Sequence, residues 1–140
     1  MRDEDGYTLT EMLVVIAIIG LIAAALTPAV FGQMNRARAK AAQLQLDTVA
    51  AAVEAFRTDI GRYPTTSEGL SALTKEPAGA EGWSGPYMRN DKALTDPWGH
   101  ALIYAAPGSD GANFYVESLG ADGKAGGTGL DRDLKAPSGS

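Results

Sequence analysis

MLVVIAIIGLIAAALTPAVF, the sequence of residues 12–31, contains no charged residue, and only Thr27 and Pro28 interrupt its apolar character. A helix rises ~1.5 Å per residue, so a run of this length can cross the ~30 Å hydrocarbon core of a bilayer. Together with its lead-in, the run predicts a transmembrane helix over about residues 9–31. The rest of the chain is expected to be anchored to a membrane by this segment.

The remainder of the chain is polar and acidic. The 140 residues carry a formal net charge of −5, and 45% of them are hydrophobic, many in the single N-terminal run. A chain of this length supports one small globular domain beside the anchor. Its acidity argues against nucleic-acid binding, which needs clustered Lys and Arg. Because the sequence has no cysteine, no disulfide can stabilise the domain, and a bound metal ion could do so instead.

Residues 6–11, GYTLTE, stand directly before the apolar run. The residues before them are too few and too acidic for an ordinary secretory signal, so one interpretation is a simple N-terminal anchor. Thr8 and Glu11 have the spacing of a capping box, in which the carboxylate accepts a hydrogen bond from a backbone N–H at the helix start. A carboxylate at the edge of a bilayer is also costly unless it is paired. Glu11 therefore has two interpretations, a helix cap and one half of an ion pair.

The same motif resembles the class III leader of type IV pilins and type II secretion pseudopilins. The resemblance implies that a membrane aspartyl peptidase cuts between Gly6 and Tyr7, and that the new N-terminal amine of Tyr7 is methylated. It also implies that Glu11 pairs with the N-terminal amine of a neighbouring subunit.

The charges after the anchor conflict with this resemblance. The positive-inside rule would place Arg36, Arg38 and Lys40 in the cytoplasm, because the leader offers only Arg2 against three acidic residues. The resemblance places them in the periplasm instead. We follow the resemblance, since a motif read by a peptidase at the cytoplasmic face fixes orientation more specifically than a bias of three charges.

A second apolar pattern follows the anchor. Apolar residues recur at spacings of four and three along one stripe: Ala42, Leu46, Val49, Val53, Phe56 and Ile60. This is the pattern of an amphipathic helix. We therefore expect one helix from about residue 10 to residue 60, with its stripe packed against a C-terminal domain. Gly20 and Pro28 lie inside this helix, and membrane helices tolerate both.

The next part of the chain predicts a small domain with short elements. Thr65 and Glu68 form a second possible capping box, which is expected to open a short helix. Residues 102–104 and 113–118 read as two antiparallel strands around a turn at residues 107–111. The small sheet is expected to pack on the long helix.

Two aromatic residues near these strands invite a functional interpretation. Trp98 stands between Asp-Pro and Gly, which is strong turn chemistry and predicts an anchor in the domain core. His100 is the only histidine, and no nucleophile stands near it in a recognisable arrangement. We expect no catalytic residue in this chain and no enzymatic activity.

Residues 118–133, SLGADGKAGGTGLDRD, form a glycine-rich loop with three aspartates. Glycines allow the tight folding that aims carbonyl groups inward, and oxygen ligands suit calcium. The spacing is not that of an EF-hand, since its alternating acidic positions and terminal Glu are missing. From composition alone the loop could equally be a solvated, flexible segment.

Four segments resemble the major pseudopilin family of type II secretion: residues 63–73, 85–88, 96–104 and 118–127. For the last of them the resemblance implies a calcium loop. Matched residue by residue, it implies Ca²⁺ ligands from the Leu119 carbonyl, Asp122, Thr128, Asp131 and Asp133.

The resemblance implies a type IV pilin-like α+β fold with a leader at residues 1–6, a long helix at residues 7–61 and a periplasmic globular domain at residues 62–140. It implies a structural subunit of the secretion pseudopilus in the inner membrane, which moves folded exoproteins through the outer-membrane secretin. The implied partners are further copies in a helical filament, minor pseudopilins, the assembly platform, the prepilin peptidase and secretin-associated components. A type IV pilus subunit for adhesion or motility is the alternative, and the absence of a cysteine pair counts against it. A membrane-tethered, calcium-dependent hydrolase is a further alternative, but no set of nucleophile, base and orienting residue is visible in the sequence.

Overall fold

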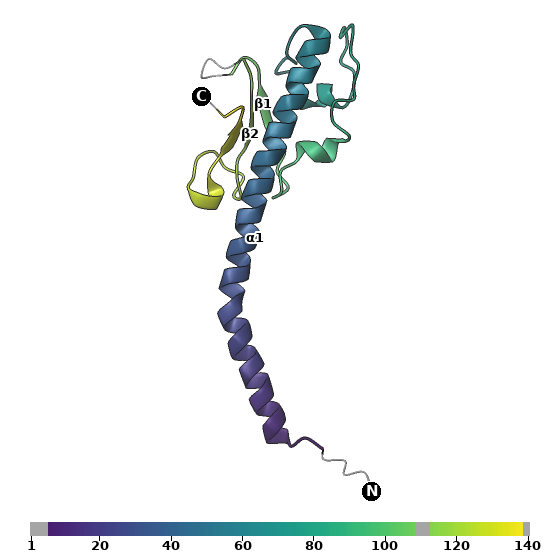
Figure 1. The fold of residues 1–140 in the computed structure, drawn as a ribbon. Coiled ribbons are helices and arrows are strands. Elements are labelled where there is room, and N and C mark those ends of the chain that lie inside the picture. The colour runs from purple at the N-terminus through teal and green to yellow at the C-terminus, as the bar shows by residue number, and fades with distance from the viewer. Residues whose placement is uncertain (1–5, 109–112, 139–140) are drawn as a thin grey trace. The chain divides into compact units, whose positions relative to one another are not determined.

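Figure 1 shows the fold as a computed structural model, which describes residues 6–108 and 113–138. Most of the predicted leader and part of the predicted turn at residues 107–111 lie outside the described residues. The chain divides into two compact units, Met1–Arg36 and Ala37–Ser140. The helix α1 contributes residues to both.

The helix α1 comprises Leu9–Ile60, 52 residues, and so begins one residue before the predicted start and ends at the predicted residue. The residue that follows the helix is Gly61, whose φ of 83° lies in the left-handed region that glycine adopts without a steric cost. The Gly61 N–H closes the last turn by donating to the Arg57 carbonyl, 2.8 Å away. Pro28 lies inside the helix.

The predicted apolar stripe is the face of α1 that is buried in the C-terminal unit. Leu46, Val49, Val53 and Phe56 are all 0% exposed, and Ile60 packs against them at the end of the helix. At ~1.5–3 kcal/mol for each large apolar side chain that is fully buried, this stripe is a major source of stability for a domain of this size. The predicted packing face is therefore confirmed.

A three-stranded antiparallel sheet covers this stripe (Figure 1). Its strands are β1 (Ile103–Ala105), β2 (Tyr115–Ser118) and β3 (Leu134–Ala136), in the order β1-β2-β3. Tyr104 pairs with Val116, and Val116 pairs with Ala136, so one buried residue from each strand faces the core. The two predicted strands are confirmed, whereas β3 was not predicted, because three residues between an acidic loop and a proline show no period of their own.

Short 3₁₀ helices connect these elements: η1 (Gly69–Leu73), η2 (Asp91–Leu94) and η3 (Gly129–Asp131). The predicted second capping box is present in the turn before η1. The Thr65 N–H donates to Glu68 Oε2 at 2.7 Å, and the Glu68 N–H donates to Thr65 Oγ1 at 3.1 Å. These two bonds satisfy backbone donors at the start of the turn.

The prediction for Trp98 is wrong. Trp98 is only partly buried and is not among the core residues, whose aromatic members include Phe56, Phe114 and Tyr104. The turn around Trp98 buries a carboxylate instead, since Asp96 is 5% exposed. The residues around Trp98 thus predicted the turn correctly, but the side chain that the turn buries in the domain is that of Asp96.

Glu68 also joins the two sides of the turn that follows α1. Its carboxylate accepts two hydrogen bonds from the Arg62 guanidinium, 2.7 Å from Nη1 and 2.8 Å from Nη2. The paired guanidinium, together with the Thr65 N–H, lowers the pKa of Glu68 from 4.5 to about 2. Two parallel bonds of this kind are stronger than an ordinary surface ion pair.

We predict that Glu68→Gln lowers the thermal midpoint at neutral pH and that the difference from the wild type disappears in acid. Because the folded pKa is below the unfolded one, the carboxylate stabilises the fold fully above about pH 4.5 and loses this effect as the pH falls toward 2. Thermal unfolding followed by circular dichroism across this range tests it. Glu81→Gln, at an exposed carboxylate, is the control and should lose less at neutral pH. A Glu68→Gln deficit that is constant from pH 7 to pH 2 would contradict the prediction.

Candidate functional site

The start of α1 contains the predicted capping box in full. The Thr8 N–H donates to Glu11 Oε2 at 2.8 Å, and the Glu11 N–H donates to Thr8 Oγ1 at 3.2 Å. The first turn of a helix leaves backbone N–H groups without helical partners, and this exchange satisfies two donors there. The capping interpretation of Glu11 is therefore confirmed.

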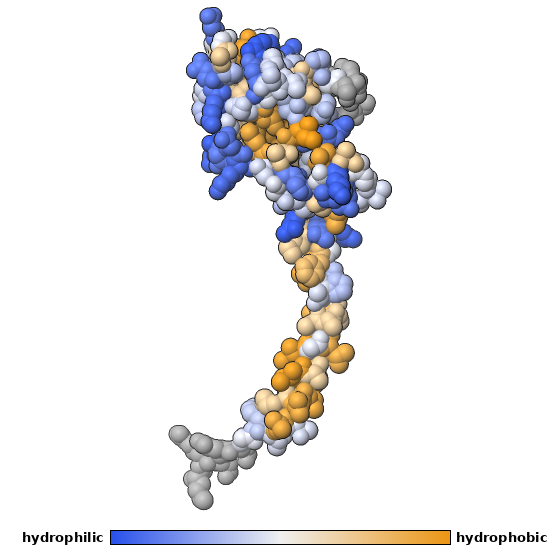
Figure 2. All heavy atoms as spheres, turned by 180° about the vertical axis from the view of Figure 1, so that it is seen from behind, coloured by the Kyte–Doolittle hydropathy of each residue, from blue (hydrophilic) through white to orange (hydrophobic). Residues whose placement is uncertain are grey.

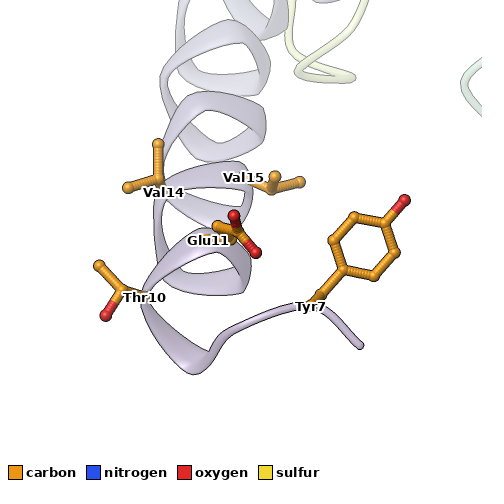
Figure 3. A pocket seen from close by; sticks show the side chains of 5 residues that line it. All are labelled: Tyr7, Thr10, Glu11, Val14 and Val15. Carbon is orange, nitrogen blue, oxygen red and sulfur yellow. The ribbon is translucent and has the colours of Figure 1, made fainter. Parts of the chain in front are cut away.

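Glu11 also lies in an open surface cavity of about 440 Å³. Figure 3 shows Glu11 on the first turn of the helix, with Val14 and Val15 one turn further on and Tyr7 on the segment that leads into the helix. All of these side chains are exposed, and Tyr7 is 81% exposed. Across residues 6–108 and 113–138, Glu11 forms no ion pair, so its charge is balanced by no basic side chain there.

The part of α1 that follows is suited to a membrane by length and composition. Its most apolar window of 18 residues has a mean hydropathy of 2.7, and 0% of that window is buried. Figure 2 shows apolar residues over much of this part of the helix, and hydrophilic residues over much of the surface of the C-terminal unit. A soluble helix with this much exposed apolar surface would be unstable in water, so the segment needs another apolar environment.

The acidic loop is folded tightly against itself. The Ala121 N–H donates to the Leu130 carbonyl at 3.0 Å, which joins the two arms of the loop. Gly120, with a φ of 71°, lies where a Cβ atom would come within 2.8 Å of the Arg132 carbonyl oxygen, so only glycine fits between the arms. The two arms of the loop are thus held together, while residues 124–132 are exposed to solvent.

The five predicted calcium ligands lie in this loop in different environments. Leu119 is partly buried just after β2, and Thr128 precedes η3. Asp122 is exposed, and its Oδ1 accepts a hydrogen bond from the Lys124 N–H at 3.0 Å. Asp131 is exposed within η3, where its N–H donates to the Thr128 carbonyl at 3.1 Å.

Asp133 differs from the other two aspartates. Its Oδ2 accepts a hydrogen bond from the Gly126 N–H at 2.7 Å, which ties the two arms together a second time. Its Oδ1 is buried and has no hydrogen-bond partner in the structure. A buried carboxylate oxygen without a partner is costly, and a cation bound next to it would remove that cost.

The three aspartates do not form one acidic cluster. Among the described residues, no group of three Asp, Glu, His or Cys side chains could hold a metal ion. The three carboxylates of the loop therefore do not make a metal site by themselves. An ion here would need main-chain carbonyl oxygens as well, and calcium accepts these readily alongside one or two carboxylates. The unpartnered Asp133 oxygen and the oxygen-only donor set of the loop fit such an ion.

Sequence reasoning missed the polar group that lies beneath this loop. Asp96 is buried, its Oδ1 accepts hydrogen bonds from the Trp98 N–H at 3.0 Å and the His100 N–H at 2.8 Å, and its Oδ2 accepts one from the Ser118 hydroxyl at 2.7 Å. The Asp-Pro turn signalled the bond to the Trp98 N–H, since Asp favours bonds to the backbone two residues on. Nothing in the sequence signalled the bond to Ser118, because the two residues are 22 positions apart.

Two family models match the chain. Residues 29–137 match "Type II secretion system (T2SS), protein G", and residues 1–27 match "Prokaryotic N-terminal methylation motif". The first covers well over half of the chain. The second covers the GYTLTE segment and most of the apolar run.

Curated relatives and a solved structure agree with these models. The type II secretion system core protein G of Pseudomonas aeruginosa is 39% identical over 137 residues, covering 95% of this chain and 94% of its own length. The protein of the same name from Xanthomonas campestris pv. campestris is 39% identical over 132 residues, covering 94% and 89%. The crystal structure of the major pseudopilin from the type 2 secretion system of enterohaemorrhagic Escherichia coli aligns with a TM-score of 0.61 and 26% identity, over 76% of this chain and 91% of that one.

Proposed function

The chain belongs to the type II secretion system protein G family, and from this premise we propose how its N-terminal motif and its acidic loop serve the assembled protein. It is a major pseudopilin, a structural subunit of the type II secretion pseudopilus. It assembles with other secretion components, and its apolar N-terminal helix fits a membrane-anchored periplasmic pseudopilus. The family match over residues 29–137 favours this function over the type IV pilus alternative.

The proposed cycle begins in the inner membrane and ends in a filament. The prepilin peptidase processes the subunit, the assembly platform adds it to a fibre that also contains minor pseudopilins, and the growing fibre pushes folded proteins toward the secretin and its associated components. The observation that supports this cycle is that the two parts of α1 differ in how their apolar surface is buried. One part buries its stripe in the subunit's own domain, while the other exposes its whole apolar surface, which suits packing against lipid and against further copies. The proposed role is structural, with no catalytic step.

Processing is proposed to occur between Gly6 and Tyr7, with methylation of the Tyr7 amine. Gly6 and Tyr7 are both exposed and precede the first residue of α1, so the peptide bond between them is accessible in a segment without regular secondary structure. The match of residues 1–27 to the N-terminal methylation motif supports the same position.

We expect the mature protein extracted from membranes to begin at Tyr7 and to carry one methyl group. Intact mass spectrometry measures both. A protein with Gly6→Ala should keep its leader, since the cut site is then changed, whereas Gly20→Ala, within α1, should be processed normally. A mature N-terminus at any residue other than Tyr7 would remove the support for the leader.

Assembly is proposed to use the charge of Glu11. After cleavage the amine of Tyr7 is cationic, and in the low-dielectric environment of packed apolar helices an unpaired carboxylate costs several kcal/mol. The capping box already satisfies the backbone near Glu11 but does not neutralise its charge. The amine of a neighbouring copy would neutralise it and would fix the register of the incoming subunit.

Glu11→Gln separates the two roles, because Gln keeps the capping box and removes the charge. We expect the Gln variant to insert in the membrane at the wild-type level but to lose most filament formation and exoprotein release. Thr8→Ala is the matched control, since it weakens the cap and keeps the charge, and it should secrete nearly normally. Secretion by Glu11→Gln at the wild-type level, with loss in Glu11→Ala, would mean that capping alone explains the residue.

The acidic loop is proposed to bind Ca²⁺ through Asp133, Asp122 and main-chain oxygens, with the Leu119 carbonyl, Thr128 and Asp131 as further ligands. The unpartnered Oδ1 of Asp133 supports this, as does the absence of nitrogen and sulfur donors from the proposed set. Bound calcium would stabilise the folded state by mass action, by about 2.7 kcal/mol at a concentration 100-fold above its dissociation constant. Such a gain is large for a small domain without disulfides.

We predict that calcium raises the thermal midpoint of the full-length protein in detergent by several degrees over its value in excess chelator. Magnesium should do so weakly, because it demands a smaller octahedral site and gives up its water reluctantly. Asp122→Ala and Asp133→Asn should each remove most of the shift and reduce secretion. Asp47→Ala, at an exposed aspartate of α1, should leave the shift intact. Equal wild-type midpoints in chelator and in millimolar calcium would rule out the site.

A further inference from the structure

Asp96 is a buried carboxylate that joins two segments of the C-terminal unit, its own turn and the end of β2. Its side chain is 0% exposed. Two backbone N–H groups of its own turn donate to Oδ1, and the Ser118 hydroxyl donates to Oδ2. A buried carboxylate needs several donors to offset the loss of water, and these three supply them. Removing one donor would therefore leave a costly, partly unsatisfied charge.

Ser118 connects Asp96 to the acidic loop by hydrogen bonds. It is the last residue of β2 and is 0% exposed. While its hydroxyl donates to Asp96, its oxygen accepts a hydrogen bond from the Gly120 N–H at 3.3 Å. The hydroxyl can donate only one proton, so the bond to Asp96 fixes its orientation and leaves the lone pairs for Gly120.

His100 holds the same loop segment from the other side. Its Nδ1 lies 3.2 Å from the Gly120 carbonyl oxygen and 3.6 Å from Asp96 Oδ2. A carbonyl only accepts hydrogen bonds, so Nδ1 carries the proton in this arrangement. The imidazole also lies against Gly123, where a Cβ atom would come within 2.8 Å of Nε2. The N–H and the C=O of Gly120 are thus both held by the group around Asp96.

Gly120 is also the residue at which the two arms of the loop meet. A Cβ atom there would lie 2.8 Å from the Arg132 carbonyl oxygen and 2.9 Å from the Leu130 carbonyl oxygen. The position of Gly120 therefore fixes the second arm as well as the first.

We propose that Asp96, acting through Ser118 and His100, is a positioning residue that holds the first arm of the acidic loop, residues 118–123, in its folded conformation before any ion binds. The effect of this positioning on calcium affinity rests on the proposed calcium-binding role of the loop. A loop that is already ordered loses less conformational entropy on binding, so this arrangement raises affinity without contributing a ligand. None of Asp96, Ser118 and His100 is among the proposed calcium ligands.

The test compares hydrogen exchange of backbone amides in the full-length protein in detergent, with excess chelator present. Ser118→Ala removes the relay hydroxyl, and exchange at Gly120 and Ala121 should accelerate about tenfold relative to amides in α1, as expected for the loss of a hydrogen bond to a charged group. Tyr104→Phe is the matched control, because it removes another buried hydroxyl bond, 2.8 Å to the Pro64 carbonyl, away from the loop. It should lower global stability without this local acceleration.

His100→Ala is a second variant with less effect on the core, since the His100 side chain is 38% exposed. It should accelerate exchange at the same two amides even if Ser118→Ala does not fold. The proposal is overturned if the variants that fold exchange these amides at the wild-type rate, or if they accelerate all amides equally, as Tyr104→Phe is expected to do.

Calorimetric titration with calcium separates this proposal from the calcium site itself. If the wild type binds calcium, Ser118→Ala and His100→Ala should weaken binding about tenfold, whereas Tyr104→Phe should not, because only the first two disturb the preordered arm. Unchanged affinity in both would overturn the link to ion binding. If the wild type binds no calcium, the calcium proposal fails, and the exchange measurement in chelator still decides whether Asp96 positions the loop.

Discussion

The C-terminal unit depends on the burial of one stripe of α1. Leu46, Val49, Val53 and Phe56 are fully buried, and the sheet and η1 supply the residues that cover them. The strands are only three or four residues long, too short to form a stable sheet alone. The helix therefore acts as the template on which the short elements pack, and that packing positions the polar groups of the C-terminal unit.

Without disulfides, the loops of this unit are held by polar groups that link distant segments. Glu68 closes the turn after α1 through Arg62, and Asp96 joins its own turn to the end of β2. Asp133 joins the arms of the acidic loop through Gly126. Glu68 and Asp96 each accept hydrogen bonds from several donors, which is the arrangement that makes a charged group stabilising in a partly buried place. Asp133 accepts one hydrogen bond, and its second oxygen is buried without a partner.

The carboxylate of Glu11 differs from these three in its surroundings. It makes the backbone contacts of a helix cap, yet it is exposed at the start of an apolar helix. Glu68 has a guanidinium as its counter-ion, while the described part of the chain offers Glu11 none. The proposed pairing with the amine of a neighbouring copy would balance this charge between subunits.

The sequence alone determined the helix, its two apolar patterns and both capping boxes, because these features arise from residues three or four positions apart. It also identified two of the three strands, through their alternation, and the family, through motifs of fixed spacing. Only the tertiary structure decided what lies inside the turn at Trp98, where Asp96 is buried instead, and that Leu134–Ala136 forms the third strand. Only the structure showed that the loop aspartates stand apart and that Ser118 links Asp96 to Gly120. These facts depend on contacts between residues far apart in the chain, and short-range patterns carry no information about which distant partner a side chain will meet.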